Sequence, residues 1–290
     1  MAGPLHDSPQ GPLYVYGIVR RGFRPRPGLT GVGGAAVVVV PEGSLAALAS
    51  AADSTSGPPS VSGPPGVSDP PGVSGPPGEP AADDASLQAT ADAHRRVVDE
   101  AAAAVCVLPT RLGTVHRDAQ EVRRILAARA DLYRRLLARL DGRLEWGVKA
   151  YAEGEEAGAA PTGTESVADG AGEPTDGLAR AAHHTLADVA ECSCVHPPRD
   201  ACPAGAAASR ATSAYWTSPI ARAPYPHGRN LLDSAYLVPR EAAGAFAETV
   251  GGLAARSPAL RIELTGPWAP YSFAEPGRLP GFPGFPGFPG

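Results

Sequence analysis

The sequence has no surplus of positive charge and no long apolar run. Its 290 residues contain 25 Lys and Arg against 30 Asp and Glu, so the formal net charge is −5. A protein that binds the phosphate backbone of nucleic acids carries a surplus of basic residues on one face, so we expect no nucleic-acid partner. A membrane-spanning helix needs about 20 consecutive apolar residues, and the sequence has no such stretch. We therefore expect no membrane partner either.

Secretion signals and a disulfide framework are also missing. The opening residues, MAGPLHDSPQGP, show no basic region followed by an apolar one, which is the pattern of a secretory signal. Four cysteines in a chain of this length do not make a disulfide scaffold. Both observations favour a protein of the reducing cytoplasm.

The cysteines that are present do not have the spacing of a metal site. Zinc-ligand residue types gather in one region, at Cys192, Cys194, His196 and Cys202, with His183 and His184 upstream. A C-x-C pair is tighter than the usual zinc spacing, and no second ligand pair follows at a matching distance. We expect no metal, with zinc as the alternative that the ligand types leave open. Cys106, between two valines, is expected to be a buried apolar residue.

Cofactor and catalytic motifs are missing as well. The glycines of residues 28–34 precede a predicted strand, whereas a dinucleotide-binding loop follows a strand and opens a helix. A turn is the better interpretation, and we expect no cofactor. No G-x-S-x-G nucleophile motif occurs. Four glutamates run from a predicted strand into a polar stretch and are expected to be solvated: Glu145, Glu153, Glu155 and Glu156. We assign no catalytic residue and expect no enzyme.

Glycine and proline, by contrast, are abundant and concentrated. The chain has 35 Gly and 33 Pro, and residues 57–80 divide into the units GPPSVS, GPPGVS, DPPGVS and GPPGEP. A collagen triple helix needs Gly at every third position, and Ser60 and Asp69 break that rule. The segment is therefore predicted to be a disordered insertion. Residues 153–177 are predicted to be a flexible loop, and the tail 280–290 to be mobile.

The first half of the chain predicts strands and two long helices. Residues 13–20 (LYVYGIVR) indicate a strand, and the apolar run 35–40 indicates a strand buried on both faces and ended by Pro41. A helix is predicted over 85–104, capped by Asp83 or Asp84, with an apolar stripe that includes His94, and a short strand over 105–108.

The clearest predicted element is a single helix over residues 118–141. Asp118 and Glu121 form a capping-box pattern, and Gly142 supplies a stop. Its apolar side chains recur at helical spacing. Six arginines lie on the opposite side of this helix: Arg123, Arg124, Arg129, Arg134, Arg135 and Arg139. An acidic partner could bind there, although a solvated face is the more ordinary interpretation.

The second half alternates strands and helices. We predict a strand over 144–152, a helix over 178–192, a strand over 231–238, a helix over 240–256, and a strand over 260–265 that Gly266-Pro267 ends. One more strand within 193–230 would complete a β-α-β-β-α-β, ferredoxin-like order. The predicted fold is therefore α+β with two domains, residues 11–142 and 143–265, and a C-terminal extension over 266–290.

Five strings of residues in this order resemble the gas vesicle GvpL/GvpF family. They are LYVYGIVR (13–20), VLPTRLGTVHRD (107–118), EWGVKAYA (145–152), LLDSAYLVPRE (231–241) and LTGPWAPYSFA (264–274). The last is the most specific, because it is close to a family pattern GPWPPY-F. The GPP units and the GFPGFPGFPG tail are not part of that pattern.

The resemblance implies a non-enzymatic accessory or minor structural protein of gas vesicle assembly. Such proteins are expected to have two α+β domains, the second ferredoxin-like, to bind the hydrophobic shell protein and other accessory proteins, and to locate to the cytoplasm or the gas vesicle. The candidate protein-interaction residues are Trp268, Tyr271, Phe273 and Arg111. The aromatic residues could instead pack on their own sheet, and Arg111 could form a structural ion pair. The alternative function is a ligand-binding protein or enzyme built on ferredoxin-like domains.

Overall fold

The computed structural model describes residues 11–52, 81–152, 174–196 and 229–279. These residues form an α+β protein with two sheets, divided into two compact units. The first unit takes its described residues from 1–105 and 110–130, and the second from 106–109 and 131–290. The predictions for 57–80, for most of 153–177 and for 280–290 fall outside the described residues.

The sheet of the first unit contains antiparallel strand pairs, with β3 (Leu45–Ala51) between two neighbours. Strand β3 pairs with β1 (Leu13–Arg20) on one side and with β2 (Val38–Glu42) on the other, and β5 (Val115–His116) pairs with β1. A turn at Gly43, whose φ is 55°, joins β2 to β3. Strand β3 was not predicted from the sequence, although six of its seven side chains are buried.

The prediction for β2 was wrong in its limits and in its burial. The strand includes Pro41, and only Val40 of its five side chains is buried. It lies at the edge of the sheet. Proline has no N–H to donate, and an edge strand tolerates this because one side of its ladder has no neighbour.

Two helices, α1 (Ala81–Ala104) and α2 (Ala119–Ala128), complete the first unit. Helix α1 begins at Ala81, so Asp83 and Asp84 lie within its first turn, and the prediction that the helix starts after one of them was wrong. The capping prediction for α2 is confirmed, since Asp118 accepts a hydrogen bond from the Glu121 backbone N–H at 2.7 Å.

The predicted helix 118–141 is in fact two helices. Arg129 has φ −114° and ψ 18°, which ends α2, and α3 (Ala130–Leu140) begins at the next residue. Strand β4 (Val107–Pro109) starts at Val107, two residues later than predicted. Among the described helices, none combines the length and the apolar character that crossing a bilayer requires.

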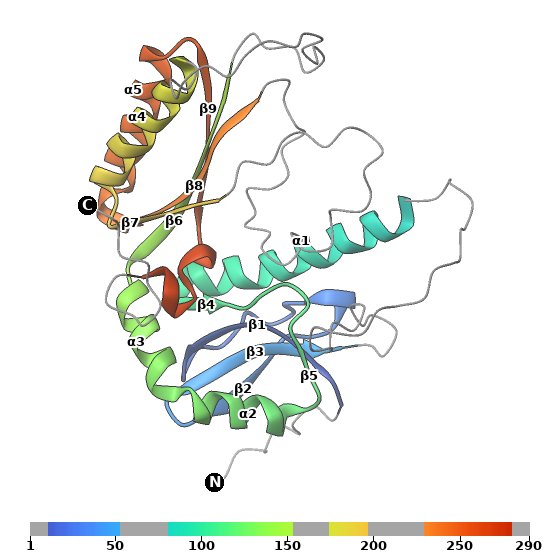
Figure 1. The fold of residues 1–290 in the computed structure, drawn as a ribbon. Coiled ribbons are helices and arrows are strands. Elements are labelled where there is room, and N and C mark those ends of the chain that lie inside the picture. Colours follow the sequence, from blue (N-terminus) through green and yellow to red (C-terminus); the bar gives the residue numbers. More distant parts are fainter. Residues whose placement is uncertain (1–10, 53–80, 153–173, 197–228, 280–290) are drawn as a thin grey trace, which may run out of the picture. The chain divides into compact units, whose positions relative to one another are not determined.

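The second unit has a four-stranded antiparallel sheet with the order β7-β8-β6-β9 (Figure 1). Its elements follow the chain as β6 (Arg143–Ala152), α4 (Pro174–Val189), β7 (Cys192–Val195), β8 (Asn230–Pro239), α5 (Ala243–Arg256) and β9 (Leu260–Trp268). Strand β7 supplies the strand that was expected within 193–230. It starts at Cys192, so the helix predicted over 178–192 ends earlier, at Val189. The helix also begins earlier, at Pro174, so the prediction that residues 174–177 belong to a flexible loop was wrong.

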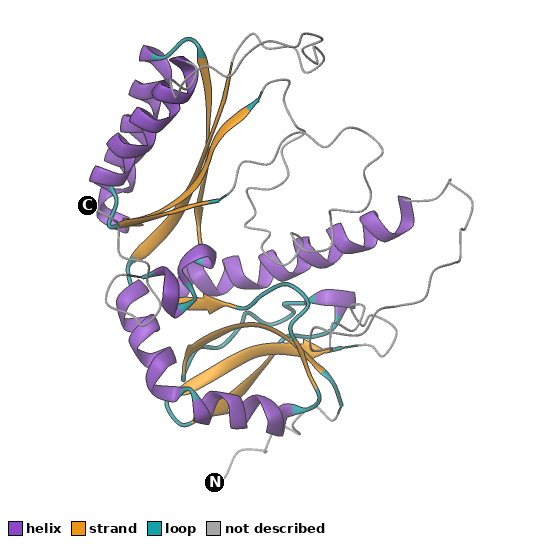
Figure 2. Cartoon of the chain, in the orientation of Figure 1, coloured by secondary structure: helices purple, strands orange, loops and turns teal. Residues whose placement is uncertain are grey.

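Helices α4 and α5 cover one face of this sheet (Figure 2). The core between them includes Val148 of β6, Tyr236 of β8, Leu186 of α4 and Phe246 of α5. Within it, the Tyr236 hydroxyl lies 2.8 Å from Nδ1 of His183. Alternate side chains of β6, such as Lys149, point to the opposite face of the sheet.

A buried aromatic cluster organises the first unit. Nδ1 of His94 lies 3.1 Å from the Tyr14 hydroxyl, and the Tyr16 hydroxyl lies 2.7 Å from Oγ of Ser50. The Tyr14 hydroxyl also accepts a hydrogen bond from the Gly113 backbone N–H at 3.0 Å. Burial lowers the pKa of His94 to about 4. The neutral imidazole is therefore part of the folded unit at pH 7.

We expect His94 to make the stability of the protein depend on pH. The imidazole titrates near pH 6.5 when the chain is unfolded. Since the folded protein binds this proton only near pH 4, its contribution is complete above about pH 6.5 and is lost as pH falls towards 4. Such a shift corresponds to about 3 kcal/mol. Urea unfolding at pH 7 and pH 4.5 should show a clearly smaller difference for His94→Gln than for the wild type. The exposed His184→Gln serves as control, and an unchanged difference in His94→Gln contradicts the assignment.

Candidate functional site

Near its end, the backbone of β9 at Gly266 lies very close to the backbone of β6 at Glu145. The strand continues through a cis Gly266–Pro267 bond to Trp268, so the prediction that this dipeptide ends the strand was wrong. Gly266 has φ 119°, and a Cβ atom there would lie 2.9 Å from the carbonyl oxygen of Glu145. Only glycine fits this position. The register against β6 shifts at the same place, so that Trp268 lies opposite Glu145.

Glu145 is the central polar residue of the site. Its side chain is completely buried, which corrects the expectation that it is solvated. One carboxylate oxygen accepts a hydrogen bond from the Ser272 backbone N–H at 2.7 Å, and the other lies 2.8 Å from the Ser272 hydroxyl, which donates to it. A buried carboxylate is stable only when it is satisfied in this way. The pair therefore attaches the chain after β9 to β6.

We call residues 269–279 the C-terminal segment. It contains the short helical turns η6 (Tyr271–Phe273) and η7 (Pro276–Arg278), and the side chains of Phe273 and Leu279 are fully buried. The Arg278 guanidinium donates a hydrogen bond to Sγ of Cys194 on β7 at 3.2 Å. The segment is thus a packed part of the second unit.

The four predicted interaction residues fall into different environments. Trp268 and Tyr271 are half-buried, whereas Phe273 is fully buried, as expected if it packs on its own unit. Nε1 of Trp268 is buried without a hydrogen-bond partner among the described residues. Arg111 is exposed and belongs to the first unit, in a turn where its carbonyl accepts a hydrogen bond from the Thr114 hydroxyl at 2.7 Å. The three aromatic residues thus belong to the second unit, and Arg111 belongs to the first.

A row of charged residues on the second sheet was not predicted from the sequence. Lys149 of β6 pairs with Asp233 of β8 at 3.6 Å, and both side chains are largely buried. On β9, Arg261 pairs with Glu263 and lies over the ring of Tyr151, 4.4 Å from its centre. The signal in the sequence is a charged residue inside an otherwise apolar strand, as in LEWGVKAYA.

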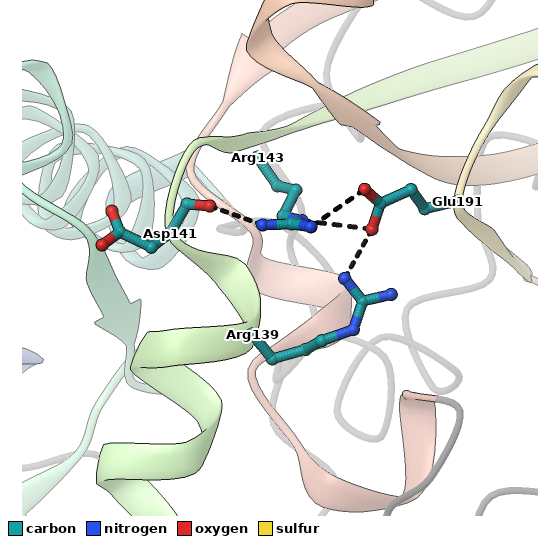
Figure 3. A network of polar contacts seen from close by, with 4 residues as sticks. All are labelled: Arg139, Asp141, Arg143 and Glu191. Carbon is teal, nitrogen blue, oxygen red and sulfur yellow. Dashed lines mark hydrogen bonds and ion pairs between the residues drawn. The ribbon is translucent and has the colours of Figure 1, made fainter.

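A second polar network lies where α3 meets the sheet of the same unit (Figure 3). Glu191, just before β7, accepts hydrogen bonds from Arg139 of α3 and from Nε and an Nη of Arg143, both at 3.1 Å. Arg143 also donates to the Asp141 carbonyl at 2.8 Å. Partial burial acts to raise the pKa of Glu191, but the hydrogen bonds and positive charges of Arg143 and Arg139 lower it below the ordinary value. The network therefore contains an ionised carboxylate between two guanidinium groups.

The cysteines of β7 show no metal-binding arrangement. Cys192 and Cys194 are free and buried, and burial raises the pKa of the Cys192 thiol to about 12. Cys202, the third cysteine of the region, is outside the described residues. Within the described part of the chain, no group of three or more His, Cys, Asp or Glu side chains is placed to hold a metal ion.

Comparison with known proteins identifies a family. The family model described as "Gas vesicle synthesis protein GvpL/GvpF" matches residues 12–275. A similar sequence is gas vesicle protein L of Streptomyces sp. (strain CB03234), which is 39% identical over 206 residues, or 63% of this chain and 68% of the relative.

Solved structures show the same fold at low identity. The crystal structure of the gas vesicle protein GvpF from Anabaena sp. PCC7120 has a TM-score of 0.60 at 18% identity, over 92% of this chain and 97% of the other. GvpF from Microcystis aeruginosa has a TM-score of 0.55 at 16% identity, over 92% of this chain and 100% of the other.

We expect Glu145→Gln to destabilise the second unit by about 2 kcal/mol, because the amide group cannot accept hydrogen bonds at both positions where Ser272 donates. Thermal and urea unfolding measure this. The control is Glu248→Gln, which changes an exposed glutamate of α5 and should leave stability nearly unchanged. Equal stability of the two variants would show that Glu145 does not hold the C-terminal segment.

The arginine–glutamate network predicts a second pH dependence. Because the pKa of Glu191 is lowered in the folded protein, its contribution is present above the ordinary carboxyl pKa and is lost as pH falls through the lower folded value. Glu191→Gln should reduce stability at pH 7 by about 1 kcal/mol, since the groups are partly exposed to solvent. It should also flatten the pH dependence between about pH 5 and pH 3. Asp188→Asn, on the exposed side of α4, should reproduce neither effect.

Proposed function

This chain belongs to the gas vesicle GvpL/GvpF family, and we therefore propose that it is a non-enzymatic accessory or minor structural protein of gas vesicle assembly. The observation that carries the proposal is the family match over residues 12–275, which spans all the described secondary structure except the last turn, η7. On this proposal the protein acts through protein contacts in the cytoplasm or at the vesicle, without a nucleic-acid or membrane partner.

The partners that we propose are the hydrophobic shell protein and other accessory proteins. A shell subunit with exposed apolar surface needs a binding surface with aromatic groups, which are enriched at protein interfaces. Trp268 and Tyr271 support this role because both residues are only half-buried. Phe273 is fully buried and so anchors the C-terminal segment that carries Tyr271.

We also propose that residues 143–265 form a ferredoxin-like domain. The support is the chain order β6-α4-β7-β8-α5-β9, in which four antiparallel strands and two helices follow the β-α-β-β-α-β plan. Among the described residues, α4 and α5 cover one face of the sheet, and the C-terminal segment is attached to the sheet through Glu145 and Cys194.

Co-purification with the shell protein tests the function. The full chain with an affinity tag, co-expressed with the shell protein, should retain it. Trp268→Ala should remove most of this binding and lower stability by about 2 kcal/mol, since the ring is partly buried.

The matched control is Trp146→Ala. Trp146 packs against the core under α4 and α5, so this variant should lose stability but retain the shell protein when it is assayed well below its melting temperature. If the wild type fails to retain the shell protein, the proposed partner is wrong. If the two tryptophan variants bind equally, Trp268 is not part of the binding surface.

A further inference from the structure

Three arginines of the second unit follow one another at four-residue spacing. Arg135 and Arg139 lie on α3, and Arg143 begins β6 just after the helix ends. Helical residues four apart lie on the same side of a helix, so Arg135 is one turn from Arg139. Arg143 is close to Arg139 because both guanidinium groups bind Glu191 (Figure 3). We call these three residues the arginine surface.

The arginine surface carries more positive than negative charge. Glu191 is a single carboxylate, and both of its oxygens are already used by Arg139 and Arg143. The carboxylate of Asp141 points away from the network in Figure 3. Arg135 is exposed, and none of the described carboxylates pairs with it.

The adjacent Arg134 differs in this respect, because Asp131 pairs with it within the helix. The charged row on the sheet of this unit is also internally paired, as Lys149 with Asp233 and Arg261 with Glu263. The arginine surface is therefore a place where the fold gathers like charges without a matching number of opposite charges. Like charges at close range repel one another and raise the free energy of the folded state. A carboxylate that binds between them reduces this repulsion.

We propose that the arginine surface, Arg135, Arg139 and Arg143, binds an acidic segment of a protein partner. The proposal rests on the proposed function, in which the chain acts through protein contacts. Guanidinium groups bind carboxylates in pairs of parallel hydrogen bonds, which suits Asp and Glu side chains. The net charge of the whole chain, −5, disfavours a long polyphosphate such as RNA.

The test uses the full chain and a fluorescein-labelled oligoglutamate peptide of about ten residues, with fluorescence anisotropy at low and at physiological salt. The wild type should bind the peptide, and added salt should weaken the binding because the contacts are charged. Arg135→Glu should weaken it by about tenfold, since the new carboxylate removes one positive charge and lies one turn from Arg139, where it neutralises a second. Arg135→Ala, which removes only one charge, should have a smaller effect.

Two controls locate the site. Arg180→Glu makes the same change at an exposed arginine of α4, and Arg24→Glu makes it in the first unit; both should bind like the wild type. The proposal is overturned if Arg135→Glu binds normally, if either control loses binding as strongly, or if an RNA oligonucleotide of equal charge binds more tightly than the peptide. Unchanged melting temperatures show that the variants are folded. The result is independent of shell-protein co-purification, so failure of one proposal can be told from failure of the other.

Discussion

The hydrogen bonds between Glu145 and Ser272 are the constraint on which the second unit depends. A carboxylate that is fully buried needs donors, and the chain supplies two of them from a residue 127 positions away. To bring Ser272 there, β9 must run past Gly266–Pro267, and the close approach to the Glu145 carbonyl admits only a glycine. The strand irregularity, the glycine and the C-terminal segment thus meet at one buried carboxyl group.

The strings that resemble the gas vesicle family meet one another in space. EWGVKAYA joins LTGPWAPYSFA through Glu145 and Ser272, and it joins LLDSAYLVPRE through Lys149 and Asp233. In the first unit, LYVYGIVR holds VLPTRLGTVHRD through the Tyr14 hydroxyl and the Gly113 N–H. The strings therefore carry contacts that define the fold. For this reason they are sufficient to indicate the family, but they do not by themselves identify a binding surface.

Elements with a clear period could be predicted from the sequence, and elements fixed by tertiary contacts could not. Strand β1 is rich in β-branched and aromatic residues, and the cap of α2 is a local hydrogen bond. Strand β3, LAALASA, consists of residues that favour helices, and only its position between β1 and β2 makes it a strand. The burial of Glu145 was missed for the same reason: its partner lies 127 residues away, where no local pattern can show it.

The charged groups of the second unit differ in how far they are paired within the fold. Lys149 and Arg261 have carboxylate partners within the sheet, so their charges are satisfied inside the fold. The arginine surface is only partly compensated, by Glu191, and Trp268 and Tyr271 are half-buried. Aromatic groups supply most of the free energy of protein association, whereas charged groups mainly set orientation and association rate. The second unit carries both kinds of group, so the contacts that we propose for it differ in kind: apolar at Trp268 and Tyr271, and ionic at the arginine surface.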